Sequence, residues 1–168
     1  MSTALLKSAF PAAENDAVVK RLLYLLNSSH SCGLVQAGTT AGKAKTVNAV
    51  SFRVDGALYN KAATDDLWDF TAQAGLGAGV YKAFWLLLST AGVASIVSGA
   101  SASSAADALA SLVSTQIPDA TKSIIGCYVA GSAGSTSFTS ALGGGAGTFY
   151  DGVPAAAGCL DTLTQHGP

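Results

Sequence analysis

The residues best suited to chemistry in this chain are its histidines and its adjacent carboxylates, and their spacing does not form a catalytic set. Nucleophilic catalysis needs a Ser or Cys within reach of a base, and the chain has 2 histidines, His30 and His166, one just after a predicted helix and one near the end of the sequence. Asp65 and Asp66 are adjacent acids, which are more typical of a helix start than of an acid/base pair. The sequence therefore predicts no catalytic residues and no enzymatic activity.

Residues 38–44 have some features of a phosphate-binding loop. The spacing is one residue short, and Ala44 stands where a Ser or Thr would have to ligate magnesium. The glycines at 75–79 and at 143–147 lack the strand–glycine–helix context of a dinucleotide fingerprint. No His/Cys cluster with metal-ligand spacing is present. We therefore expect no cofactor and no bound metal.

The cysteines and the aromatic residues offer no firmer site. Cys32, Cys127 and Cys159 are far apart in the sequence, and their odd number argues against a closed disulfide framework. We expect them to be reduced and partly buried, with one bridge as the alternative. An aromatic group could bind sugars or bases, but in a chain built largely of small residues it is expected to fill the core. This group consists of Trp68, Tyr81, Phe84 and Trp85.

Charge is scarce along the chain. Charged residues make up 11% of the sequence, against about 25% in a typical soluble domain. None occurs between Lys82 and Asp107, and none between Lys122 and Asp151. Gly, Ser and Thr interrupt both stretches, so neither is expected to span a membrane. The nine basic residues are scattered, which argues against a nucleic-acid partner. A surface so poor in charge is suited to being covered by neighbouring subunits.

The sequence divides into an arm, residues 1–34, and a β domain, residues 35–168, whose C-terminal third is rich in Gly and Ser. In the arm, residues 15–27 are predicted to form an amphipathic helix, because its apolar residues recur at helical spacing. We expect this apolar face to contact a neighbouring subunit or a shell protein. The residues of this predicted interface are Val18, Leu22, Leu25 and Leu26.

Alternating apolar residues and turn signals predict the elements of the β domain. Asp55-Gly56 follows the alternating segment 47–54 and indicates a hairpin. Further strands are expected at 80–88, 93–97, 124–130 and 148–150, and a capped helical turn at 64–68. Ser104 and Asp107 have the spacing of a capping box, which predicts a helix that Pro118 ends. The predicted fold is mainly β, a small antiparallel β-barrel or sandwich with an N-terminal arm helix and one inserted short helix.

Two runs within residues 43–68 carry a resemblance to a known group. They are Lys-x-Lys-Thr-x-Asn-Ala and Asp-Gly-x-Leu-Tyr-x-Lys-Ala-Ala-Thr-Asp-Asp. Together with Leu-Leu-Leu-x-x-x-Gly at 86–92, the Ala-rich segment 102–113 and the Ile-Gly strand at 125–129, they resemble small tailed-bacteriophage virion structural proteins of the capsid cement or decoration type. The resemblance extends over roughly residues 40–150, and its motifs are structural rather than chemical.

The resemblance implies a structural role and no catalytic residues. The expected function is a cement protein that stabilises the head shell of a virion assembled in the bacterial host cytoplasm. Its expected partners are the major capsid protein and further copies of itself, arranged as a homotrimer, with no nucleic acid and no membrane. A tail or fibre component that binds a host surface is the main alternative. A small hydrolase is a weaker one, because histidine is so scarce.

Overall fold

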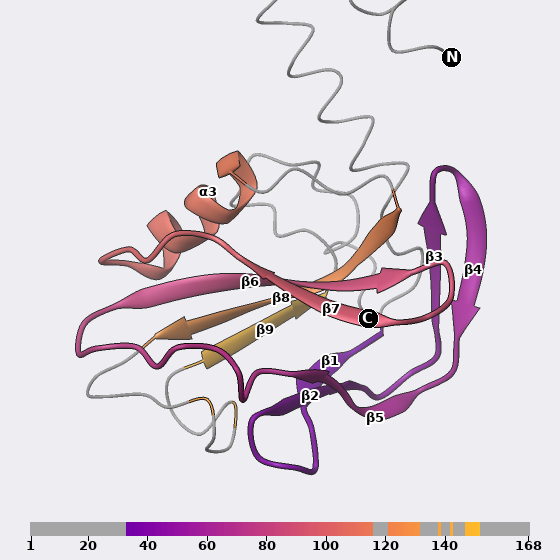
Figure 1. The fold of residues 1–168 in the computed structure, drawn as a ribbon, viewed down its shortest axis with the longest axis horizontal. Coiled ribbons are helices and arrows are strands. Elements are labelled where there is room, and N and C mark those ends of the chain that lie inside the picture. The colour runs from indigo at the N-terminus through magenta and orange to yellow at the C-terminus, as the bar shows by residue number, and fades with distance from the viewer. Residues whose placement is uncertain (1–32, 116–120, 132–137, 139–141, 143–146, 152–168) are drawn as a thin grey trace, which may run out of the picture.

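The computed structural model describes residues 33–115, 121–131, 138, 142 and 147–151. In this part of the chain the fold is mainly β, with nine strands and one α-helix (Figure 1). The strands are β1 Val35–Ala37, β2 Lys43–Thr46, β3 Val50–Val54, β4 Ala57–Lys61, β5 Thr64–Asp69, β6 Tyr81–Ser89, β7 Ala94–Ser98, β8 Lys122–Gly131 and β9 Gly147–Asp151, and the helix is α3, Ala105–Thr115.

The strands form three antiparallel sheets, with the orders β1-β2-β5, β3-β4 and β7-β6-β8-β9. The edges of the two larger sheets approach each other, since β1 contacts β9 and β5 contacts β7. Where β1 contacts β9, the Val35 amide donates a hydrogen bond to the Asp151 carboxylate at 3.0 Å. No backbone ladder joins the sheets there, so among the described residues no sheet closes into the barrel that was one of the two predicted forms.

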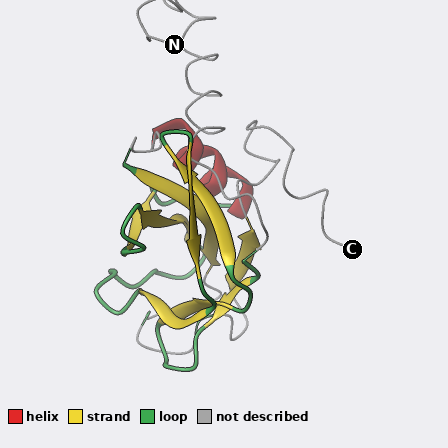
Figure 2. Cartoon of the chain, turned by 90° about the vertical axis from the view of Figure 1, so that its right-hand side faces the viewer, coloured by secondary structure: helices red, strands yellow, loops and turns green. Residues whose placement is uncertain are grey.

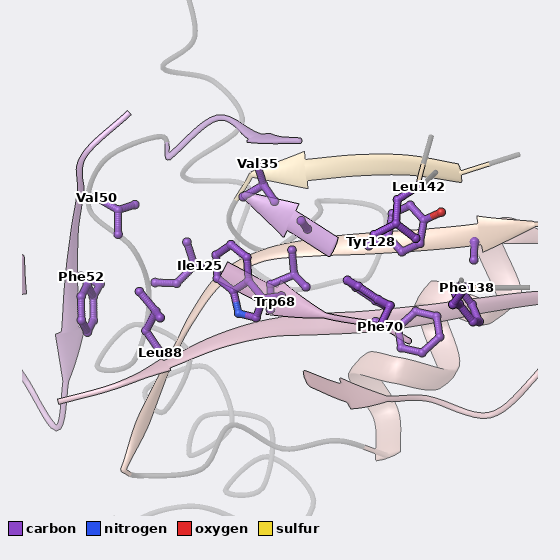
Figure 3. Packing of buried hydrophobic residues seen from close by; sticks show 14 of the residues in the cluster. Val35, Val50, Phe52, Trp68, Phe70, Leu88, Ile125, Tyr128, Phe138 and Leu142 are labelled. Atoms are coloured by element: carbon purple, nitrogen blue, oxygen red, sulfur yellow. The ribbon is translucent and has the colours of Figure 1, made fainter. Parts of the chain in front are cut away.

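Two strands, β6 and β8, are covered on both faces. Residues 83–88 of β6 are all buried, and they alternate between two hydrophobic clusters. The inter-sheet core takes side chains from all three sheets, and its members from β6 are Phe84, Leu86 and Leu88. Figure 3 shows part of this core, with Leu88 labelled. The helix-side core lies under α3 and contains Trp85 and Leu87. A strand buried on both faces reads as a continuous apolar run, and such buried runs form residues 83–88 of the first charge-free stretch and residues 123–131 of the second.

A β-bulge in β8 shifts the register of this central pair. Leu86 faces Gly126 while Leu87 faces Ile124, so Ile125 is the additional residue. Next to the shift, the buried indole Nε1–H of Trp68 donates to the Leu87 carbonyl at 3.1 Å. A bulge interrupts the ladder locally, and this bond ties β5 to β6 at that place.

The predicted hairpin is confirmed. Asp55 and Gly56 have φ values of 50° and 80°, the two positive values that a two-residue hairpin turn requires. Five residue pairs join β3 to β4 in regular register. Phe52 and Tyr59 form one of these pairs, and their rings stack with centroids 5.9 Å apart. In Figure 1 this hairpin stands upright at one side of the larger sheets.

The predicted inserted helix is also confirmed, and Figure 2 shows it against one side of the strands. The Ser104 hydroxyl oxygen accepts from the Asp107 amide at 3.1 Å, and the hydroxyl donates to the Asp107 carboxylate at 2.7 Å. Leu109 and Leu112 are buried against the sheet. No helix in the described part of the chain is long and apolar enough to cross a membrane.

The predicted helical turn at 64–68 is wrong, because these residues belong to β5. There, Ala44 faces Trp68 and Thr46 faces Thr64 across the ladder, so three residues of β5 lie opposite one of β2. Asp66, within this irregularity, has a φ of 51°. Burial of Trp68 against the inter-sheet core therefore outweighs the local preference of Thr64 and the aspartates for a helix start.

The segment 15–27, predicted to form the arm helix, lies outside the described residues, and so do the four residues of its predicted interface, Val18, Leu22, Leu25 and Leu26. The same holds for His30, His166, Cys32 and Cys159.

Candidate functional site

The adjacent carboxylates meet the tip of the β1–β2 hairpin. The Asp65 carboxylate accepts hydrogen bonds from the Thr39 amide, at 3.1 Å, and from the Thr39 hydroxyl. The Asp66 carboxylate accepts in the same way from the Thr40 amide, at 2.9 Å, and from the Thr40 hydroxyl. We call these four residues the Thr–Asp clasp. Consecutive residues on one segment thus bind consecutive residues on the other.

The hydrogen bonds of the clasp hold the loop and, at Asp65, favour the ionised carboxylate. Hydrogen bonds from the Thr39 hydroxyl and amide lower the pKa of Asp65 from its ordinary value, because they stabilise the ionised form. A general acid or base at neutral pH needs a raised pKa, so the shift runs in the wrong direction. The structure therefore gives Asp65 the role of an ionised acceptor.

The loop at 38–44 forms the turn of the β1–β2 hairpin and leads into a strand. The Gly38 amide donates to the Lys43 carbonyl at 2.7 Å, and Gly42 has a φ of 75°. A phosphate loop presents free backbone amides to its anion, whereas the Thr39 and Thr40 amides are bonded to carboxylates of this chain. These amides are therefore already engaged within the chain, which differs from the free amides of a phosphate loop.

Lys43 forms an ion pair with Asp69 across the β2–β5 ladder, at 3.5 Å. The pKa of Asp69 lies below its ordinary value, chiefly because the Thr71 hydroxyl and amide donate to its carboxylate. Lys43 contributes less to this shift. Both side chains reach solvent, so we expect the pair to contribute little to stability.

The aromatic group lies in the two cores, as predicted. Trp68 and Phe84 belong to the inter-sheet core and Trp85 to the helix-side core, each with at most 1% of its surface exposed. Tyr81 is half-buried and packs against the helix-side core. Three of these four side chains therefore have no face available to a sugar or a base.

The one described cysteine is also unsuited to reaction. Cys127 is buried and unpaired, and desolvation raises the pKa of its thiol to about 12. It is a neutral thiol at physiological pH, whereas the reactive form of cysteine is the thiolate. Within the ranges that the structure describes, no group of three or more His, Cys, Asp or Glu side chains could hold a metal ion.

The surface exposes several apolar side chains whose exposure was not predicted from the sequence. Leu58, the second residue of β4, has 59% of its surface exposed, and Val93, after the β6–β7 turn, has 64%. Leu34 and Val47 are exposed to a smaller degree. The exposure of Leu58 could have been predicted from the Asp55-Gly56 turn. Pairing across that turn places Tyr59 opposite Phe52 on the inner face, so the neighbouring side chain, Leu58, points outward.

Comparison of the chain with protein-family models, with curated proteins and with solved structures finds no match.

Proposed function

We propose that this protein is a structural protein of a phage virion, a capsid cement or decoration protein that stabilises the head shell. The observation that supports this best is the resemblance in residues 43–68, which supply β2 to β5 and the exposed β3–β4 hairpin. The other segments of the resemblance fall on the β6–β7 hairpin, on α3 and on the bulged part of β8. These are framework elements, in keeping with a structural role.

We further infer that the two larger sheets are the layers of a β-sandwich, because the inter-sheet core draws residues from both of them. In this proposal the arm helix lies against a sister subunit or the major capsid protein. Val18, Leu22, Leu25 and Leu26 supply its apolar face. Burying apolar surface stabilises an interface by about 25 cal/mol per Å² before association costs, and repetition over a shell increases the effect by avidity.

The number of copies per virion tests this proposal. Quantitative mass spectrometry of purified particles, with antibody labelling in electron micrographs, should find hundreds of copies distributed over the head. A dozen copies or fewer at the tail would contradict the cement role and favour the tail or fibre alternative. Absence of the chain from mature particles would contradict both.

Substitutions in the arm test the proposed mechanism. Replacing Leu22 and Leu25 with Asn should reduce binding to shells of the major capsid protein, because it removes apolar surface from the predicted contact. Lys20→Asn, on the opposite face of the predicted helix, is the matched control and should leave binding unchanged. Equal binding by both variants would remove the arm from the mechanism.

A further inference from the structure

Among the described strands, β4 has one edge without a ladder partner and without a close contact to a strand of another sheet. The outer edges of the two larger sheets contact one another, β1 against β9 and β5 against β7. In the two-stranded sheet, β3 also contacts β8, whereas β4 pairs with β3 alone among the described strands. It is also a strongly exposed strand, with Ala57, Leu58 and Asn60 all open to solvent. The free side of β4 is therefore the available place for a further strand to pair.

The turn determines which backbone groups point away from the hairpin. In a hairpin with a two-residue loop, the pair flanking the loop is hydrogen-bonded, and bonded and non-bonded pairs then alternate. Val54 and Ala57 flank the loop, so the pairs of Leu58 with Arg53 and of Asn60 with Ser51 are the non-bonded ones. The N–H and C=O groups of Leu58 and Asn60 consequently point outward along the free edge.

This edge has few of the features that usually prevent strand pairing. Natural edge strands are protected by proline, by bulges, by lysines, by inward-pointing charges or by being very short, and of these β4 has a lysine at its end and a length of five residues. The segment 50–61 contains no proline, its ladder has no register shift, and the single charge of β4 is Lys61 at its end. Leu58, with 59% of its surface exposed, adds an apolar side chain next to the central residue Tyr59.

We propose that the β4 edge pairs with β4 of a second copy of this chain, antiparallel and centred on Tyr59. This register places Leu58 of each copy opposite Asn60 of the other, so that the outward N–H and C=O groups meet as hydrogen-bonded pairs. It also brings Lys61 of one copy towards the turn that carries Asp55 of the other. A parallel arrangement would set the two Lys61 side chains side by side, so charge favours the antiparallel form.

The contact is small and therefore weak when it acts alone. Two five-residue strands bury far less than the roughly 1,000 Å² expected of a stable interface, so pairing should appear only at high protein concentration. The proposal does not depend on the capsid role. If that role holds, a twofold contact would join neighbouring trimers rather than build a trimer.

Amide hydrogen exchange of the purified full-length chain, measured by NMR from about 10 μM to about 1 mM, tests the pairing without any capsid protein. The Leu58 and Asn60 amides should exchange more slowly as concentration rises, by about tenfold where nine tenths of the chains are paired. The Tyr59 amide points towards β3 and should stay protected throughout, as an internal control. Concentration-independent exchange at Leu58 and Asn60 would overturn the proposal.

Two variants make the test specific. Leu58→Lys places a charge on the edge, and Asn60→Pro removes an outward N–H that β3 does not use. Each should abolish the concentration-dependent protection of the remaining outward amide, while a protected Tyr59 amide shows that the hairpin is still folded. Val47→Lys, which adds the same charge at an exposed apolar residue outside the hairpin, should retain the protection. Protection that survives Leu58→Lys would also overturn the proposal.

Discussion

At the scale of single residues, the Asp65 carboxylate holds a loop in place by staying ionised. Two donors of Thr39 reach it, and the adjacent pair of Asp66 and Thr40 repeats the arrangement. The sequence could suggest carboxylates that cap backbone amides, because Asp and Thr are the usual capping residues. It could not indicate that the amides belong to a loop 26 residues earlier, since that contact depends on how β2 and β5 pair.

Replacing Asp65 with Asn should lower stability at neutral pH and remove part of its dependence on pH. The pKa of Asp65 is lowered in the folded state, so its contribution is complete above the ordinary value of about 3.9. That contribution is lost as pH falls through the lowered folded value. Urea midpoints of the two proteins should therefore differ at pH 7 and converge in strong acid.

The control for this prediction is Thr39→Ser, which keeps both donors and should follow the unmodified protein across the pH range. A gap between Asp65→Asn and the unmodified protein that stays constant from pH 7 into strong acid would show that the carboxylate charge is not responsible.

At the scale of elements, the sequence predicted correctly those turns and caps whose conformation depends on neighbouring residues. The Asp55-Gly56 turn and the Ser104–Asp107 cap are fixed by residues close in sequence, and both predictions are confirmed. The strands β1, β2 and β5 were not anticipated, because β1 and β2 are only three and four residues long and β5 pairs with β2 across a long sequence separation. For the bulge in β8, the only indication in the sequence was Gly126, a residue that weakens a strand.

Gly126→Ala should destabilise the protein by about 1–3 kcal/mol, as overpacking of a close-packed site does. An added Cβ would lie 2.7 Å from the Tyr150 carbonyl oxygen and 2.9 Å from Val35 Cγ2. The first of these atoms is backbone, so β9 would have to move. The matched control is Gly77→Ala, whose Cβ would have one neighbour, at 3.9 Å. It should change stability by less than about 0.5 kcal/mol.

Denaturant unfolding measures both variants under the same conditions. If Gly126→Ala and Gly77→Ala have the same midpoint, the close packing at the bulge does not constrain β8.

At the scale of the whole molecule, the scarcity of charge has a cause within the chain itself. The first charge-free stretch contains most of β6 and the second contains most of β8. On one side these strands are covered by apolar side chains of the inter-sheet core and on the other by α3. Composition alone could not separate cover by the same chain from cover by neighbouring subunits. The structure assigns the first kind to residues 83–88 and leaves Val93, in the same stretch, exposed.

A pair of lysine substitutions within this stretch separates the two kinds of cover. Leu86 is fully buried in the inter-sheet core, so Leu86→Lys would bury an unpaired charge and should abolish cooperative thermal unfolding of the purified chain. Val93→Lys should change stability by less than about 0.5 kcal/mol, because its side chain is 64% exposed. Thermal unfolding followed by circular dichroism compares them. If both substitutions destabilise the protein equally, the stretch lacks charge for a reason other than burial within its own chain. If the Val93→Lys protein folds but does not enter particles, a neighbouring subunit covers that turn.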